Sequence, residues 1–452
     1  MATPGDTIRV TTKDNDSIEG LLLPVSQEGM LLIKLDSGYN IGVKQDDVRR
    51  IAVLEKAEEK RAGEKKLFPG EKASENGAVP AKTSSTKTIP AKTLPTITIL
   101  HTGGTIASRV DYRTGGVHTA FSPEDLVQMF PELKELANID SELIAQMWSD
   151  DLRFGHFSSI AKKIEQHIRK GTRGIIIGMG TDNLAVGAAA LAFIVEKTPI
   201  PIILVGAQRS SDRGSSDAAM NLLCTAEFIA KTDFAGVAIC MHEWSSDKSC
   251  AILPATKTYK LHSSRRDAFK AVNAEAIARI DYETKKIEFL QKNYPKRGTV
   301  PPVFKPKMED KVGLLKIHVN MFPEQFEFFA GYKGLVIEGT GLGHTPGQIP
   351  NPECEIHRKI YPAIKKVIDS GCVVVMTTQC LFGGVNMNVY DKGRDLLNLG
   401  VIPGKDMLAN TALVKLSWLL ANYPKNEVRN LIGQNLRGEI NEQLEYKEDV
   451  LG

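Results

Sequence analysis

Two short apolar segments, each ending in a glycine-rich loop that carries threonine, constrain the fold of this chain more than any other feature. The first is Ile97-Thr-Ile-Leu100, which continues into His101-Thr-Gly-Gly-Thr-Ile-Ala-Ser108. The second is Gly174-Ile-Ile-Ile177, which continues into Gly178-Met-Gly-Thr-Asp-Asn183. Such runs are typical of buried parallel strands, and open α/β sheets bind their ligands where these strands end. We therefore expect both loops at one ligand-binding edge of a parallel sheet.

The two loops contain the groups that acyl transfer requires. They offer threonine hydroxyls, the carboxylate of Asp182 beside Thr181, and glycine N–H groups that can stabilise an oxyanion. Phosphate binding is the main alternative for glycine-rich loops. However, neither loop contains GxxxxGK[ST] or GxGxxG, and Gly339-Thr-Gly-Leu-Gly343 has the wrong spacing. HExxH and clustered Cys/His patterns are also missing from the sequence, so we expect no metal.

Length and composition indicate a soluble protein of two or three domains. The chain has 452 residues, 42% hydrophobic and 25% charged, and its formal charge is only +3. Six cysteines form no CxxC pair, which favours reduced thiols. The sequence contains no run as long as a membrane span and no apolar signal region at its start. We expect a cytoplasmic protein.

Residues 1–54 differ in pattern from the rest of the chain. Apolar and polar positions alternate over short runs that Gly and Asp interrupt, which predicts a small antiparallel β-barrel of about five strands. Residues 55–95 are rich in Glu, Lys and Ala, and then in Ser, Thr and Pro. We expect a charged helical stub at 55–66 and an extended linker after it. A basic tether for RNA is the weaker alternative, because Glu is interspersed among the Lys residues.

Beyond residue 95, strands and helices alternate regularly, which predicts α/β domains built on parallel sheets. We expect a doubly wound domain at 96–292, a connector near 293–302, a smaller α/β domain at 303–425 and a tail or helix at 426–452. The expected strands are 97–100, 174–178, 201–206, 236–241, 312–318, 334–338 and 372–377. The expected helices are 122–137, 156–170, 183–196, 217–230, 357–370, 391–399 and 406–422.

Several motifs resemble those of the L-asparaginase family. The two loops match its active-site loops in order and separation, and Val205-Gly-Ala-Gln-Arg209, Ser215-Ser-Asp-Ala-Ala-Met-Asn-Leu222 and Lys260, nine residues before Phe269, extend the match. The resemblance covers about residues 96–425. It implies the asparaginase fold, hydrolysis of an amide amino acid, and sites completed at the interface of a homodimer.

Three further segments have no counterpart in ordinary asparaginases. They are the N-terminal barrel, Cys380-Leu-Phe-Gly-Gly-Val-Asn-Met-Asn-Val-Tyr390 and Gly400-Val-Ile-Pro-Gly-Lys-Asp-Met-Leu-Ala409. All three resemble the family of D subunits of archaeal glutamyl-tRNA(Gln) amidotransferases. That resemblance implies an E-subunit partner, which uses ATP and Mg and amidates the glutamyl group on tRNA(Gln), and a heterotetramer containing a homodimer of this chain. It implies no cofactor in this chain.

The resemblance also implies residue roles. Thr105 is the nucleophile; Thr181, Asp182 and Lys260 form a proton relay; and Tyr112 supplies a second hydroxyl. Ser149 binds the α-carboxylate of the substrate, with Gly104 and Asp150 beside it. Taken singly, some of these residues have simpler interpretations, because Thr181 with Asp182 could only cap a helix and Lys260 could be a surface lysine. His101 and His344 fit structural roles better than catalytic ones.

The chain departs from the asparaginase pattern at a few positions. Met179 and Asn183 replace the family's usual His and Thr in the second loop, and Gly383-Gly-Val385 replaces Gly-Arg-Val. Two alternatives therefore stay open beside the amidotransferase subunit. They are a free-standing L-asparaginase and a non-catalytic scaffold.

Overall fold

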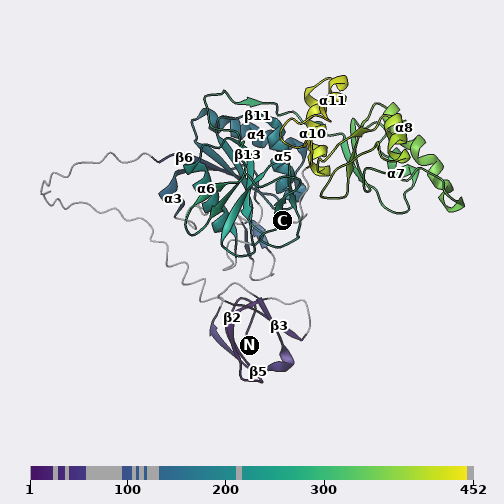
Figure 1. Ribbon diagram of the computed structural model, residues 1–452. Coiled ribbons are helices and arrows are strands. Elements are labelled where there is room, and N and C mark those ends of the chain that lie inside the picture. Colours follow the sequence, from purple (N-terminus) through teal and green to yellow (C-terminus); the bar gives the residue numbers. More distant parts are fainter. Residues whose placement is uncertain are drawn as a thin grey trace, which may run out of the picture.

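The computed structural model describes residues 2–23, 29–35, 40–56, 94–103, 108–110, 117–119, 132–209 and 216–444. Figure 1 shows a strand-only part near the N-terminus, a large sheet with helices, and a smaller sheet with helices. No helix in these ranges is long and apolar enough to cross a membrane. The predicted stub at 55–66 lies almost wholly outside them; Glu55 itself ends a strand, so the helix does not begin there.

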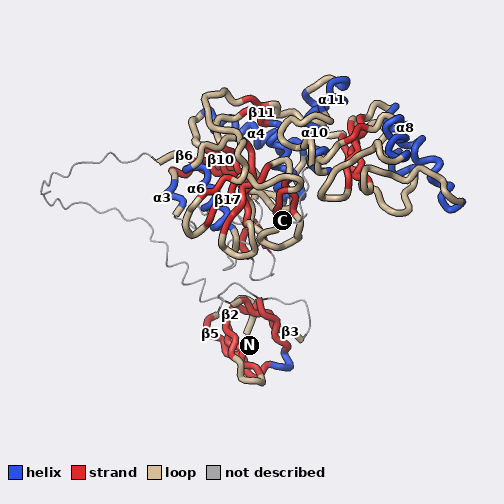
Figure 2. The backbone as a smooth tube through the Cα atoms, in the orientation of Figure 1, coloured by secondary structure: helices blue, strands red, loops and turns tan. Residues whose placement is uncertain are grey.

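The N-terminal part is a five-stranded antiparallel sheet, as the alternating pattern predicts. Its order is β4-β3-β2-β1-β5, and Figure 2 shows the strands curling into a ring. Ile8 and Val10 point into a small apolar core, whereas Arg9 between them is exposed. The elements are β1 (Thr7–Thr12), β2 (Ser17–Leu23), β3 (Met30–Lys34), β4 (Asn40–Lys44), the 3-10 turn η1 (Gln45–Asp47) and β5 (Val48–Glu55).

The large domain is built on an eight-stranded mixed sheet of order β18-β17-β14-β13-β12-β10-β6-β9. Five of its strands are parallel: β6 (Thr96–His101), β9 (Asn138–Leu143), β10 (Gly174–Gly178), β12 (Pro201–Val205) and β13 (Gly236–His242). The other three are antiparallel: β14 (Ser249–Pro254), β17 (Ala278–Asp281) and β18 (Ile287–Phe289). The prediction of a parallel sheet is therefore correct for five strands and wrong for the three antiparallel strands at one side of the sheet.

Helices cover both faces of this sheet, which makes the domain doubly wound. Ile175 and Ile177 pack with α4 (Phe154–Arg169) and α5 (Leu184–Ile194), whereas Ile176 packs on the opposite face with α6 (Ala218–Lys231). This alternation follows from the period of two in a strand. Of the predicted helix at 122–137, residues 122–131 lie outside the described ranges, and α3 (Leu133–Leu136) is its described part.

Several short elements complete the large domain. The predicted helix at 183–196 stops at Ile194, because the chain there enters β11 (Val195–Lys197), which pairs with β19 (Val303–Phe304) beyond the connector. Two hairpins are also formed, β7 (Ser108–Val110) with β8 (Val117–Thr119), and β15 (Thr258–Lys260) with β16 (Phe269–Ala271). The 3-10 turn η3 (Ser149–Asp151) precedes α4.

The smaller domain has a parallel sheet of order β20-β21-β22-β23. Its strands are β20 (Val312–Lys316), β21 (Gly334–Gly339), β22 (Val373–Thr378) and β23 (Ile402–Pro403). Its helices are α7 (Pro323–Glu327), the 3-10 helix η4 (Pro352–Lys359), α8 (Ile360–Asp369), α9 (Asp391–Leu399), α10 (Ala409–Asn422) and α11 (Lys425–Leu431). Helices α8 and α10 therefore begin three residues later than the helices predicted at 357–370 and 406–422.

One apolar core joins the two α/β domains. Helix α5 is apolar on all sides and buried from Gly187 to Ile194, because it lies between the large sheet and α10 of the smaller domain. Phe193 of α5 stacks on Trp418 of α10, with ring centroids 5.8 Å apart. The domains therefore hold each other in place through continuous packing. Four of the six free thiols are buried in separate apolar cores, Cys224, Cys240 and Cys250 in the large domain and Cys372 in the smaller one.

Candidate active site

The two glycine-rich loops leave neighbouring strands at the same edge of the large sheet, as the sequence predicts. β6 and β10 are paired in parallel, with Gly178 opposite His101. The amide nitrogen of Thr102 donates to the carbonyl oxygen of Gly178 over 3.0 Å. Its hydroxyl donates to the same oxygen over 3.3 Å. The first loop is therefore attached to the second where both begin.

Gly103 is required by the conformation of the first loop. Its φ is +97°, and a Cβ atom there would lie 2.8 Å from the carbonyl oxygen of Met147 and 2.9 Å from its nitrogen. The chain approaches this closely because Met147 N–H donates to the carbonyl oxygen of Thr102. Thr105 and Gly104, the next residues of the loop, and Tyr112 lie outside the described residues, so their roles stay predictions.

Lys260 meets Thr181 and Asp182 at the second loop. Its Nζ atom lies 2.9 Å from Thr181 Oγ1 and 2.7 Å from Asp182 Oδ1. The hydroxyl and the lysine side chain are largely buried, whereas 63% of the Asp182 side chain is exposed. The structure thus brings together the three residues of the predicted relay, from positions 78 and 79 residues apart in the sequence.

Ser149 packs directly on the second loop. It is buried, and a Cβ atom on Gly180 would lie 2.9 Å from its Oγ. Asn183 fixes this contact, because its backbone N–H donates to Ser149 Oγ over 3.2 Å and its Nδ2 donates to Ser149 O over 2.9 Å. Asp150 follows in the same 3-10 turn and is exposed. No local pattern around Asn183 indicated this function.

Met179 does not face the candidate site. Its side chain is fully buried. Its sulfur packs against α5, only 2.8 Å from the position that a Cβ atom on Gly187 would take. Its backbone N–H donates to Val205 O over 3.0 Å. Met179 therefore belongs to the core beneath the loop, and its presence removes no group from the Thr181–Lys260 cluster.

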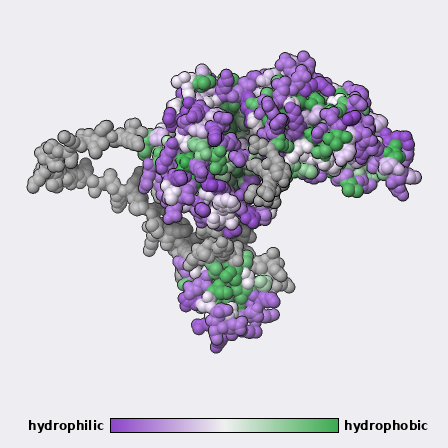
Figure 3. All heavy atoms as spheres, in the orientation of Figure 1, coloured by the Kyte–Doolittle hydropathy of each residue, from purple (hydrophilic) through white to green (hydrophobic). Residues whose placement is uncertain are grey.

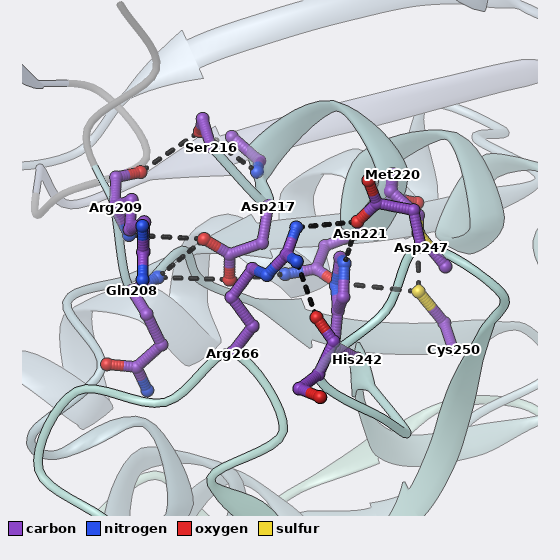
Figure 4. A network of polar contacts seen from close by, with 12 residues as sticks. Gln208, Arg209, Ser216, Asp217, Met220, Asn221, His242, Asp247, Cys250 and Arg266 are labelled. Carbon is purple, nitrogen blue, oxygen red and sulfur yellow. Dashed lines mark hydrogen bonds and ion pairs between the residues drawn. The ribbon is translucent and has the colours of Figure 1, made fainter. Parts of the chain in front are cut away.

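A buried carboxylate organises the loop after β12. Asp217, at the start of α6, accepts hydrogen bonds from the backbone N–H groups of Gln208 and Arg209, at 3.0 and 3.1 Å (Figure 4). Burial raises the pKa of Asp217, although these hydrogen bonds act in the opposite direction. Gly206 precedes these residues and faces the methyl group of Thr181. Asp217 thus fixes the chain that supports Thr181.

The network continues from Asp217 to the hairpin of Lys260. Asn221 donates to Asp217 over 3.2 Å and contacts His242 Nδ1 at 2.7 Å. His242 Nε2 lies 3.2 Å from Asp247, to which Arg266 of the β15–β16 loop donates over 2.6 Å (Figure 4). Burial lowers the pKa of His242 and favours its neutral form. The motif around Asp217 was recognised in the sequence, but its connection to the β15–β16 hairpin was not predicted.

The two histidines considered in the sequence lie outside this cluster. His101 is buried at the end of β6. His344 borders a hollow of about 410 Å³ on the smaller domain, lined by Gly341, Leu342, His344, Tyr390, Asp391 and Lys392. Burial, with Lys392 nearby, lowers the pKa of His344. Within the described ranges, no group of His, Cys, Asp and Glu side chains is placed to hold a metal ion.

Family models match three parts of the chain. The model described as "Asparaginase, N-terminal" matches residues 96–295, and "Glutaminase/Asparaginase C-terminal domain" matches residues 311–431. The model "GatD N-terminal domain" matches residues 2–54.

Similar proteins and structures agree with these matches. The D subunit of the glutamyl-tRNA(Gln) amidotransferase of Thermococcus kodakarensis is 42% identical over 96% of this chain and 94% of its own length. The D subunit of Methanosarcina mazei is 42% identical over 97% of this chain and 98% of its own length. The thermostable L-asparaginase from Thermococcus kodakarensis has a TM-score of 0.67 and 29% identity, covering 77% of this chain and all of its own. L-asparaginase I from Vibrio cholerae has a TM-score of 0.64 and 25% identity. The match covers 77% of this chain and 99% of the asparaginase.

The close approach at Gly103 predicts an unequal effect of two alanine substitutions. Gly103→Ala should lower the free energy of unfolding by at least about 2 kcal/mol more than Gly171→Ala, because only Gly103 faces backbone that cannot move aside. Gly171 is the matched control, since its φ is +91° and no atom lies within 4 Å of its Cβ position. Chemical denaturation of the full-length variants measures both. Equal losses would contradict the packing of Met147 on the first loop.

Proposed function

Because this chain belongs to the family of glutamyl-tRNA(Gln) amidotransferase D subunits, we propose that it releases ammonia from an amide amino acid for such an amidotransferase. Its substrate is glutamine or asparagine, and the ammonia converts Glu-tRNA(Gln) to Gln-tRNA(Gln) in a complex with an E subunit. The single observation that carries the proposal is the contact of Lys260 Nζ with Thr181 Oγ1 and Asp182 Oδ1 at the loop edge.

The first step forms a covalent intermediate on Thr105. Its hydroxyl oxygen attacks the side-chain amide carbon while its proton passes to the relay. The C–N bond then breaks, the leaving nitrogen takes up a proton, and ammonia departs from an acyl-threonine ester. Water attacks this ester, which releases the acidic amino acid and restores the Thr105 hydroxyl. Backbone N–H groups of the glycine-rich loops stabilise the oxyanion of each tetrahedral intermediate.

The geometry around Lys260 supports its place in the relay. A threonine hydroxyl is too weakly acidic to ionise at neutral pH, so a base must accept its proton. The Lys260 amine, once neutral, accepts a proton through the Thr181 hydroxyl that it contacts, and Asp182 stabilises the ammonium that results. Tyr112 supplies a second hydroxyl. Ser149, with Gly104 and Asp150 beside it, binds the α-carboxylate of the substrate.

The N-terminal barrel supports delivery of ammonia to a partner rather than free hydrolysis. Its charged surface is mixed, with Lys44 and Arg49 exposed beside Asp46 and Asp47. Ile51, Val53 and Leu54 of β5 are exposed as well, and Figure 3 shows apolar side chains gathered on the visible face of this part. Such a surface fits protein better than RNA. We propose that two copies of this chain and two E subunits form a heterotetramer. ATP and Mg are used by the E subunit, and this chain holds no cofactor.

Two other functions compete with this proposal. The first is a free-standing L-asparaginase, because this chain covers the whole L-asparaginase from Thermococcus kodakarensis. That function requires no module at residues 2–54. A non-catalytic scaffold is suggested by Met179 and Asn183. The structure weakens this suggestion, because Met179 packs in the core and Asn183 positions Ser149.

Replacing Lys260 tests the relay. Lys260→Met should lower kcat for glutamine by at least about 100-fold, because loss of a positioned base removes this much. Lys270→Met is the matched control, since Lys270 lies on the same hairpin but donates to the Glu243 carbonyl; it should keep more than about half of the activity. Ammonia release with the E subunit measures both. Near-normal turnover of Lys260→Met would overturn the relay.

Removing the barrel tests the partner. We expect glutamine hydrolysis by the full chain to rise when an E subunit and Glu-tRNA(Gln) are added. The protein lacking residues 1–94 should keep its basal hydrolysis but lose most of this stimulation, because the catalytic loops lie beyond residue 95. Turnover that responds to neither addition, in either protein, would leave the free-standing asparaginase as the function.

A further inference from the structure

The hairpin that carries Lys260 is closed at its base by the chain's own backbone. Lys260 pairs with Phe269 across the hairpin, and Val272 N–H donates to the carbonyl oxygen of Lys257 over 2.7 Å. Lys257 and Asn273 therefore mark the points where the chain enters and leaves the hairpin. Both points are hydrogen-bonded to the smaller domain, although the hairpin itself belongs to the large domain that contains Thr181.

The entering chain is held by a buried ion pair. Lys257 Nζ donates to the carboxylate of Asp406, and both side chains are almost wholly inaccessible to solvent. Lys257 Nζ also lies 3.2 Å from the Asp406 carbonyl oxygen. The preceding residue, Thr256, accepts a hydrogen bond at its carbonyl oxygen from Thr411 of α10 over 2.9 Å. These contacts fix the entry point to the smaller domain.

The leaving chain is held by a reciprocal pair of hydrogen bonds. Asn273 Nδ2 donates to Gly383 O over 2.8 Å, and Gly383 N–H donates to Asn273 Oδ1 over 3.0 Å. We call the Lys257–Asp406 pair the first anchor and the Asn273–Gly383 pair the second. Gly384 packs on the first anchor, because a Cβ atom there would lie 2.9 Å from Lys405 O and 3.0 Å from Asp406. This packing explains why the chain has Gly384 where the asparaginase pattern has Arg.

Asn441 connects the two anchors. Its Nδ2 donates to Asn273 O over 2.6 Å and to Asp406 Oδ2 over 2.9 Å. Its backbone N–H donates to Asp406 Oδ1 over 3.0 Å. The segment before it is fixed in turn, because Glu439 forms a fully buried ion pair with Lys415 at 2.6 Å. One side chain near the C-terminus thus joins both ends of the hairpin.

We propose that Asn441 is a positioning residue for Lys260, acting through Asp406 and Asn273 at the two ends of the hairpin. The inference rests on the proposed function, because it assigns Asn441 a part in the same reaction. Lys260 ends β15, only three residues after Lys257. A shift of the hairpin base therefore moves the ammonium away from its contacts at 2.7 and 2.9 Å, and proton transfer requires such contacts.

Kinetics of Asn441→Ala test the inference. With the E subunit present, kcat for glutamine should fall about 10- to 100-fold while KM changes less than about threefold, because a displaced supporting group affects the chemical step. Asn422→Ala is the matched control. Asn422 Nδ2 likewise bridges two acceptors, but these are the backbone carbonyls of Lys307 and Trp418, which do not hold the hairpin. An equal fall in kcat for both variants would overturn the inference.

Hydrogen exchange of the full chain separates this inference from the proposed function, because it requires no activity. In Asn441→Ala, amides of residues 258–271 should exchange about tenfold faster, whereas those of β21 and β22 stay unchanged. Unchanged exchange in the hairpin overturns the positioning role, whatever the activity. If instead the wild-type protein released no ammonia from glutamine with its E subunit, that result would count against the proposed function.

A second variant covers the case in which Asn441→Ala does not fold. Asn273→Gly keeps a left-handed backbone, which Asn273 adopts with φ at 52°. It also keeps the carbonyl oxygen that Asn441 contacts, while it removes the bridge to Gly383. The same fall in kcat and the same faster exchange are expected. Normal values for both in Asn273→Gly would contradict attachment of the hairpin through the smaller domain.

Discussion

The contact between the Lys260 ammonium, the Thr181 hydroxyl and the Asp182 carboxylate is the interaction that the rest of the structure serves. Its groups come from the β15–β16 hairpin and from the loop after β10. A long, flexible lysine keeps such a contact only if both backbones are fixed. The sheet fixes the loop, the Asp217–His242 network reaches the end of the hairpin, and the smaller domain holds its base.

Two buried ion pairs, Lys257 with Asp406 and Lys415 with Glu439, lie close to the hairpin base and the C-terminal segment. Burial lowers the pKa of Lys257 and of Lys415, while Asp406 and Glu439 favour the charged forms of the two lysines. Buried ion pairs add little net stability, because desolvation offsets much of the attraction. Breaking one is costly, however, since the remaining charge lacks a partner. Apolar packing of α5 on α10 brings the domains together. The Lys257–Asp406 pair crosses the boundary between them, and the Lys415–Glu439 pair holds the C-terminal segment on α10.

Sequence reasoning predicted the features that depend on local pattern. The apolar runs placed both loops at one sheet edge, and the nine-residue spacing of Lys260 and Phe269 corresponds to their pairing across a hairpin. Features that depend on distant partners were missed. Nothing near Asn441 in the sequence indicates Asp406. The antiparallel strands β14, β17 and β18 lie between residues 249 and 289, where no element was predicted. Thr105 and Tyr112 rest on the resemblance alone.

The central claim is that hydrolysis passes through an ester on Thr105, and peptide mass spectrometry tests it most directly. The protein, with its E subunit, would be mixed with a slowly hydrolysed glutamine analogue, quenched in acid and digested. The account predicts an added acyl group on the peptide containing Thr105, and none in the Thr105→Val protein. An adduct on another residue, or hydrolysis of the analogue with no adduct at all, would contradict it.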